Sequence, residues 1–162
     1  MWTVAGCGQN TGTSHATGRP AGAAERRQRV VQTAYGLKTR TRLNMAEAEA
    51  RVRELLAAEG FGILTEIDVA ETLRVKLGLT RSPYRILGAC NPQLAAEALE
   101  NEADVGLLLP CNVVVYEDGG STVVAVLDPA TMVSLTGNPA LEHVATEARV
   151  RLERVVDLLS RR

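Results

Sequence analysis

The apolar and polar positions of the chain predict a series of short strands. Between Tyr35 and Leu43 every second residue is apolar or threonine, and Lys38, Arg40 and Arg42 lie between them. Such alternation is typical of a strand with one buried face. Further strands are expected at residues 61–67, 84–90, 111–117 and 121–128.

Segments with helical spacing separate most of these strands, and suitable capping residues precede them. Asn44 with Glu47 has the sequence of a capping box, in which each residue caps a backbone group of the other. Asp68 with Glu71 repeats this pattern. Asn91 precedes a proline, which is favoured in the first turn of a helix. We therefore expect a helix after each of these three caps.

The longest predicted helix runs from Asn138-Pro139 to about Leu159, after a short helical piece that starts at Asp128. One stripe along this helix is apolar, and the face opposite the stripe is charged. The stripe consists of Leu141, Val144, Ala145, Ala148, Leu152, Val155 and Leu159. A helix of this kind packs its apolar face against a core.

The elements follow one another in the order β-α-β-α-β-α-β-β-α, and 162 residues are the size of one domain. Helices that alternate with the strands of one sheet have to cover a face of it. We therefore expect an α+β fold of two layers over residues 30–162, with one sheet of about five strands and helices packed on one face. Residues 1–29 are rich in Gly, Thr, Ala and Arg without apolar periodicity, and we expect a disordered tail there.

The hairpin formed by the last two strands is apolar on both of its faces. Val113 and Val115 point to one side of the sheet, and Val114 and Tyr116 point to the other. The helices of a two-layer domain can cover only one of these sides. We expect a second copy of the chain on the other side, as in a homodimer. A helix of the same chain on that side is the alternative.

The distribution of charge argues against nucleic acid as a partner. Four arginines and one glutamate precede Gln32, whereas 14 basic and 18 acidic residues follow it, and the net charge is −1. Phosphate binding requires clustered lysine and arginine, which an acidic body does not offer.

The sequence also predicts a cytoplasmic protein that does not act at a membrane. No apolar run has the length of a membrane span, and the first residues lack the basic and apolar regions of a signal peptide. Three cysteines, one of them in the tail, are too few for a disulfide framework.

Six segments of the chain resemble a known family. They read GFGILTEIDV, LRVKLGL, YRILGACNPQLAAEAL, GLLLPCNVVVYE, LDPATM and GNPAL. From about Tyr35 to its end, the chain is similar to the bacterial and archaeal domain-of-unknown-function family three hundred and two. The resemblance implies a compact α+β domain that pairs as a dimer, and it implies no substrate. Residues before Val30 lie outside the resemblance.

Two cysteines at the ends of predicted strands are the first candidates for chemistry. Cys90 precedes a helix N-terminus, whose partial positive charge favours a thiolate. Cys111 opens the next strand and lies beside Cys90 if these strands pair. Two neighbouring thiols can form a disulfide, relay a persulfide or provide half of a soft-metal site. Alternatively, both are small buried apolar residues, which is the commonest state of free cysteine.

Three polar residues are further candidates for ligand binding. Asn91 is a helix cap in the simplest interpretation. Asn112 precedes no helix, so its amide either bridges loops or contacts a ligand, and we favour bridging. Arg85 lies in an otherwise apolar strand and either binds an anionic ligand or pairs with Glu66 on the neighbouring strand, and we favour the pair.

Three functions remain, because the GxxxxGKS/T phosphate loop and the GxSxG elbow are absent from the sequence. The cysteines have neither CxxC spacing nor a nearby histidine, so no metal site is predicted, and the cofactor stays unknown. The first function is a homodimeric module that binds a small ligand or a sulfur species. The second is a thiol-redox protein with Cys90 and Cys111 as the catalytic pair. The third is a domain that only assembles. The candidate ligand-binding residues are Cys90, Asn91, Cys111, Asn112 and Arg85.

Overall fold

The computed structural model describes residues 29–161, so apart from Arg29 the predicted tail of residues 1–29 lies outside the described residues. The strands are β1 (Val31–Gln32), β2 (Gly36–Thr41), β3 (Gly62–Asp68), β4 (Tyr84–Cys90), β5 (Cys111–Asp118) and β6 (Ser121–Leu127). The helices are α1 (Met45–Ala58), α2 (Val69–Leu77), α3 (Pro92–Asn101), α4 (Ala130–Thr136) and α5 (Glu142–Leu159), with short 3-10 helices η1 (Ala103–Leu108) and η2 (Pro139–Leu141). Within residues 29–161, no helix has the length and apolarity needed to cross a membrane.

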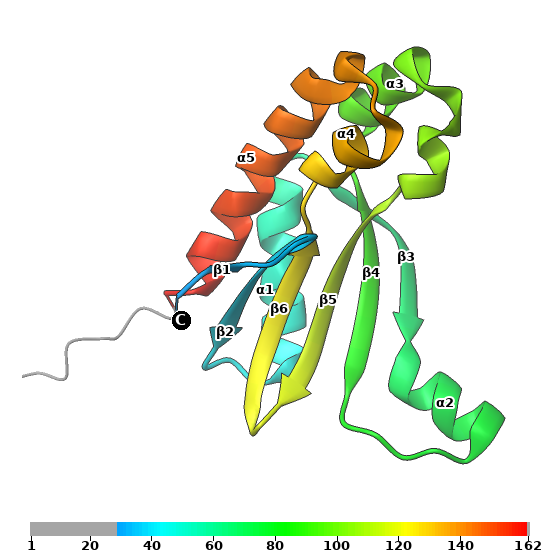
Figure 1. The fold of residues 1–162 in the computed structure, drawn as a ribbon. Coiled ribbons are helices and arrows are strands. Elements are labelled where there is room, and N and C mark those ends of the chain that lie inside the picture. Colours follow the sequence, from blue (N-terminus) through cyan, green and yellow to red (C-terminus); the bar gives the residue numbers. More distant parts are fainter. Residues whose placement is uncertain (1–28, 162) are drawn as a thin grey trace, which may run out of the picture.

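All strands join one antiparallel sheet in the order β1-β2-β6-β5-β4-β3 (Figure 1). The predicted α+β fold with one sheet is therefore confirmed. The sheet has six strands rather than about five, because β1 adds an edge strand that pairs with β2. Its two residues, Val31 and Gln32, are too few to show an alternation, so the pattern does not reveal it.

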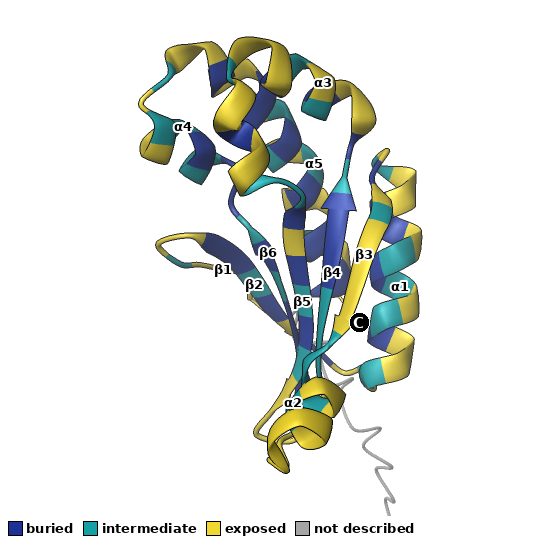
Figure 2. Cartoon of the chain, turned by 90° about the vertical axis from the view of Figure 1, so that its right-hand side faces the viewer, coloured by how far each residue is buried: buried dark blue, intermediate teal, exposed yellow. Residues whose placement is uncertain are grey.

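Helices α1 and α5 cover one face of the sheet and form the core with it (Figures 1 and 2). The apolar stripe predicted for the last helix faces the sheet, and all its members from Val144 to Leu159 are buried. The helices packed on one face are therefore confirmed. The strand residues that point to this covered face are buried: Leu37, Leu87, Val113, Val115, Val124 and Val126.

The predicted caps of the first two helices are present, one completely and one in part. Asn44 accepts a hydrogen bond from the backbone N–H of Glu47 at 3.0 Å, and Glu47 accepts one from the backbone N–H of Asn44 at 3.0 Å. Asp68 accepts from the backbone N–H of Glu71 at 2.9 Å. The carboxylate of Glu71, however, accepts two hydrogen bonds from Arg74, so the second capping box is half formed.

Helix α2 differs from the other helices because none of its residues is buried. The spacing predicts that Ala70, Leu73 and Leu77 face the core, but Leu77 is 64% exposed and the other two are half-buried. Figure 2 shows the helix mostly exposed at one end of the sheet. The prediction of an inward face is therefore wrong for Leu77, because spacing groups residues on a face but does not place a core opposite that face.

The opposite side of the sheet, which we call the open face, carries the half-buried residues Ile86, Val114, Tyr116, Ala125 and Leu127. It points towards the viewer in Figure 1, and no helix of residues 29–161 crosses its middle. A groove of about 460 Å³ lies on it. The described residues therefore do not supply the same-chain helix that we considered as its cover.

Candidate functional site

Cys90 and Cys111 meet at one end of the sheet. Cys90 is the last residue of β4, where Asn91 starts the next helix, and Cys111 is the first residue of β5. The two strands are antiparallel, and their register pairs Ala89 with Cys111. Both cysteines line one cavity. The structure thus brings together two residues that the sequence keeps on separate strands.

This cavity is small and apolar. Its volume is about 20 Å³, and about 10–15 Å³ is enough to hold one water molecule. Phe61, Leu94 and Met132 contribute to its wall beside the two cysteines. Cys111 is only 5% exposed, whereas Cys90 is half-buried, so Cys90 is the thiol that solvent reaches. The cavity has room for one atom-sized species and none for an organic ligand.

Burial governs the acidity of the two thiols. It raises the pKa of Cys111 to about 11, and the neighbouring Cys90 adds to this effect. Burial also raises the pKa of Cys90. The helix N-terminus next to Cys90 therefore does not produce the activated thiolate that the sequence led us to expect. A neutral thiol is a poor nucleophile, and this weighs against the thiol-redox interpretation.

Asn91 borders the cavity but uses its side chain to start α3. Its Oδ1 accepts hydrogen bonds from the backbone N–H groups of Gln93 and Leu94, both at 3.1 Å. The residue is buried, as expected for a cap inside the fold. The simplest interpretation of Asn91, that of a helix cap, is therefore confirmed. Its role at the cavity is to hold the helix start against the end of β4.

Asn112 lies on the other side of the sheet. Side chains alternate along a strand, so the neighbour of Cys111 points to the open face. Its register partner is Gly88, and it lines the groove of the open face together with Tyr84 and Tyr116. The structure therefore separates Asn112 from the cysteine cavity. The two Cys-Asn pairs resemble each other in sequence but not in their surroundings.

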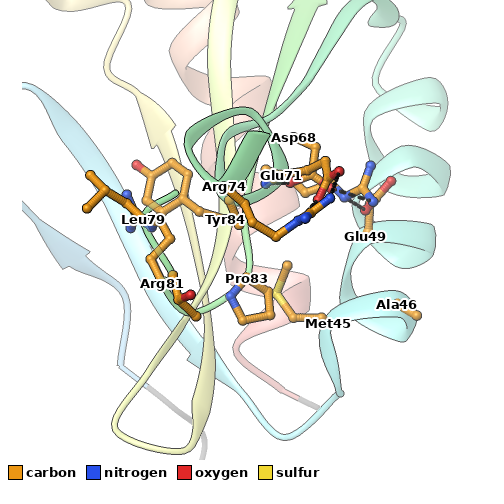
Figure 3. A pocket seen from close by; sticks show the side chains of 13 residues that line it. Met45, Ala46, Glu49, Asp68, Glu71, Arg74, Leu79, Arg81, Pro83 and Tyr84 are labelled. Carbon is orange, nitrogen blue, oxygen red and sulfur yellow. Dashed lines mark hydrogen bonds and ion pairs between the residues drawn. The ribbon is translucent and has the colours of Figure 1, made fainter. Parts of the chain in front are cut away.

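Arg85 lies near the far end of β4 from Cys90, in a cleft of about 410 Å³ between α1, α2 and residues 79–83 (Figure 3). Its guanidinium approaches Glu66 at 2.7 Å, Asp68 at 3.2 Å and Glu49 at 3.4 Å. The predicted pair with Glu66 is confirmed. Three carboxylates surround this one guanidinium, so Arg85 has no positive charge to spare for an anionic ligand.

Further paired charges lie in this cleft and beside it. Arg53 donates a hydrogen bond to Glu66, which together with the charges of Arg53 and Arg85 lowers the pKa of this carboxyl group. Glu71 is bound by Arg74, which lowers the pKa of Glu71. The cleft is therefore a network of ion pairs in contact with water, which is the arrangement of a solvated surface rather than of a reactive site.

Sequence reasoning missed two features. Tyr84 and Tyr116 stack with ring centroids 5.2 Å apart, and the guanidinium of Arg81 lies 4.6 Å from the ring of Tyr84. These tyrosines are register partners, so only the pairing of β4 with β5 reveals their contact. The second feature is Met132 of α4, which is 2% exposed and lines the cysteine cavity. Its only signal in the sequence is its place in the segment LDPATM.

Comparisons with known proteins identify the family. The model of the family described as "Domain of unknown function DUF302" matches residues 37–159. The chain belongs to the DUF302 family. It is also similar to a solved structure described as the uncharacterized conserved protein DUF302 from Bacillus stearothermophilus, with 35% identity and a TM-score of 0.74. The match covers 78% of this chain and 99% of that chain. The curated proteins contain no match. The six segments thus identified the DUF302 family correctly.

Proposed function

We propose that this DUF302 protein is a homodimeric module that carries a single sulfur atom as a persulfide on Cys90. The observation that supports the proposal is that Cys90 and Cys111 both line one small apolar cavity. A cavity of about 20 Å³ excludes an organic ligand but has room for the additional sulfur atom. The proposal places the protein in the cytoplasm, whose reducing conditions keep both cysteines free.

The two cysteines have different roles in this proposal. Cys90 receives the sulfur atom because it is half-buried, whereas Cys111 is 5% exposed. Cys111 lies next to the bound sulfur and can donate its S–H to it, as a weak donor. The apolar wall formed by Phe61 and Leu94 keeps water away from the persulfide.

Loading with tetrasulfide tests the sulfur site. The thiolate form of Cys90, a minor fraction because burial raises the pKa of this thiol, attacks tetrasulfide and takes one sulfur atom from it. Trisulfide leaves as a dianion, and the terminal sulfur of the new persulfide takes up the proton that Cys90 released. Cold cyanolysis should then release about one labile sulfur per chain. A Cys90→Ser chain should release almost none, and Cys111→Ala should retain less than half. Cys7, which lies outside the described residues, is replaced by serine in every chain.

Met45→Leu is the control, because this residue lies at the charged cleft and not at the cysteine cavity. Circular dichroism of each chain checks that the variants fold. Equal release from the Cys90→Ser chain and its parent would overturn the proposal. A parent chain that carries no labile sulfur and only dimerises would leave assembly as the function.

The open face supports the homodimer in this proposal. It carries four half-buried apolar residues, Ile86, Val114, Ala125 and Leu127, and no described helix crosses its middle. The covered face of the same strands is buried by α1 and α5. A face of this composition is stabilised by a second apolar surface. A second copy of the chain supplies an identical surface, as a two-fold symmetric contact requires.

Light scattering on a sizing column tests the homodimer. The parent chain should have the mass of two chains of 17.3 kDa each. Val114→Arg places a charge in the middle of the open face and should shift the mass to that of one chain. Val150→Arg is the matched control, because Val150 is 41% exposed on α5. A parent monomer, or a dimer that Val114→Arg leaves intact, would rule out this interface.

A further inference from the structure

A third sulfur-containing residue lines the cysteine cavity. Met132 of α4 lines it together with Cys90 and Cys111, although the three residues come from three different elements. Met132 is 2% exposed and Cys111 is 5% exposed. Within residues 29–161, no group of three or more His, Cys, Asp or Glu residues is placed to hold a metal ion. A methionine is not among those residue types, so a site made only of sulfur requires a separate argument.

Thiolate and thioether ligands together prefer a particular class of metal. Magnesium, calcium and manganese prefer oxygen, and zinc in structural sites takes four ligands of sulfur or nitrogen. Monovalent copper prefers soft sulfur ligands, and cysteine and methionine both supply them. The cavity of about 20 Å³ has room for one ion. We infer that the cavity binds a single Cu(I) ion through the sulfur atoms of Cys90, Cys111 and Met132.

The start of a helix offsets the negative charge that this site gains on binding Cu(I). When Cu(I) enters, both cysteines lose their protons to water, so the site passes from neutral to one negative charge. An isolated negative charge in an apolar cavity is unfavourable. Helix α3 starts at Pro92, two residues after Cys90, and has ten residues. The partial positive charge at its N-terminus lies beside the site and offsets the added charge.

The inference depends on the proposed function in one respect, because both require the two thiols to open into the same cavity. Met132 distinguishes the copper site from the persulfide on Cys90. A persulfide on Cys90 needs no thioether, whereas a three-sulfur copper site does. A change at Met132 should therefore weaken the binding of copper and leave the loading of sulfur unchanged.

An anaerobic titration tests the copper site. Cu(I) is supplied as its coloured complex with bathocuproine disulfonate, and the loss of colour reports transfer to the protein. The parent chain with Cys7→Ser should remove about one Cu(I) per chain. Met132→Leu conserves the volume of the side chain and should weaken the affinity at least about tenfold, because the loss of an outer-shell partner alone costs about 10- to 100-fold and a lost ligand costs no less. Cys90→Ser and Cys111→Ala should weaken it further.

Met45→Leu is again the matched control, and it should bind Cu(I) as the parent chain does. X-ray absorption of the loaded protein should show sulfur neighbours alone. A parent chain that leaves the coloured complex intact, or a Met132→Leu chain with unchanged affinity, would overturn the copper site. If the same parent chain still takes up sulfur from tetrasulfide, the proposed function stands without it. If neither copper nor sulfur is bound, both fail.

Discussion

Neighbouring residues of β4 show how differently the two faces of the sheet are used. Leu87 points to the covered face and is 0% exposed, whereas Ile86 points to the open face and is half-buried. Both are large and apolar, and they lie on one strand. The difference arises because α1 and α5 pack on one face only. Burial in this protein is therefore decided by what lies opposite a side chain rather than by the side chain itself.

The largest expected effect is the loss of a core side chain. Leu87→Ala should lower the free energy of unfolding by about 2–5 kcal/mol, because it leaves a cavity between the sheet and the helices. Ile86→Ala should cost less than about 1.5 kcal/mol, since part of the side chain is already in contact with water. Urea unfolding of both variants in the parent chain, at one protein concentration, measures the difference. Equal losses would show that the two faces are equally covered.

A smaller effect should appear at alkaline pH through Cys111, which also points to the covered side. Its pKa is about 11 in the folded chain and 9.0 for an ordinary thiol. The unfolded chain therefore loses this proton first. The contribution of the Cys111 thiol to the free energy of unfolding is fully present below about pH 9, and it is lost as the pH rises towards 11. At about 1.4 kcal/mol for each pKa unit, the total loss is about 2–3 kcal/mol.

Urea unfolding at pH 8 and pH 10.5 checks this prediction, with Cys111→Ala as the reference. The alanine chain should lose less stability than the parent over that interval, because it has no thiol to ionise at this position. An identical loss in both chains would mean that Cys111 is as open to water as a residue of the open face.

Much of the fold follows from patterns within short segments. The stripe of α5, the cap at Asn91 and the double apolarity of the β5-β6 hairpin are visible in the sequence and present in the structure. The pair of Arg85 with Glu66 also agrees with the sequence, because a charged residue in an apolar strand needs a partner. The predicted inward face of α2 does not agree with the structure, because helical spacing groups residues on one face but does not show what lies opposite that face.

The candidate site was only partly predictable. The sequence places Cys90 and Cys111 at the ends of two strands, and the structure brings them together. The sequence places Asn112 beside Cys111, but the alternation of side chains along β5 turns the amide to the open face. Met132 joins the site from a helix that is distant along the chain. Its contact depends on how α4 packs over the end of the sheet, which no local pattern encodes.

By itself, the sequence determined which segments are strands and helices, where three helices begin and which family the chain belongs to. Hydrophobic period and capping are local properties, so a window of a few residues contains the information. Only the tertiary structure decided which face of the sheet is covered, how Asn112 is separated from Cys111, and that three sulfur-containing residues line one cavity. These features depend on packing between segments that are far apart along the chain, and such packing is a property of the whole fold.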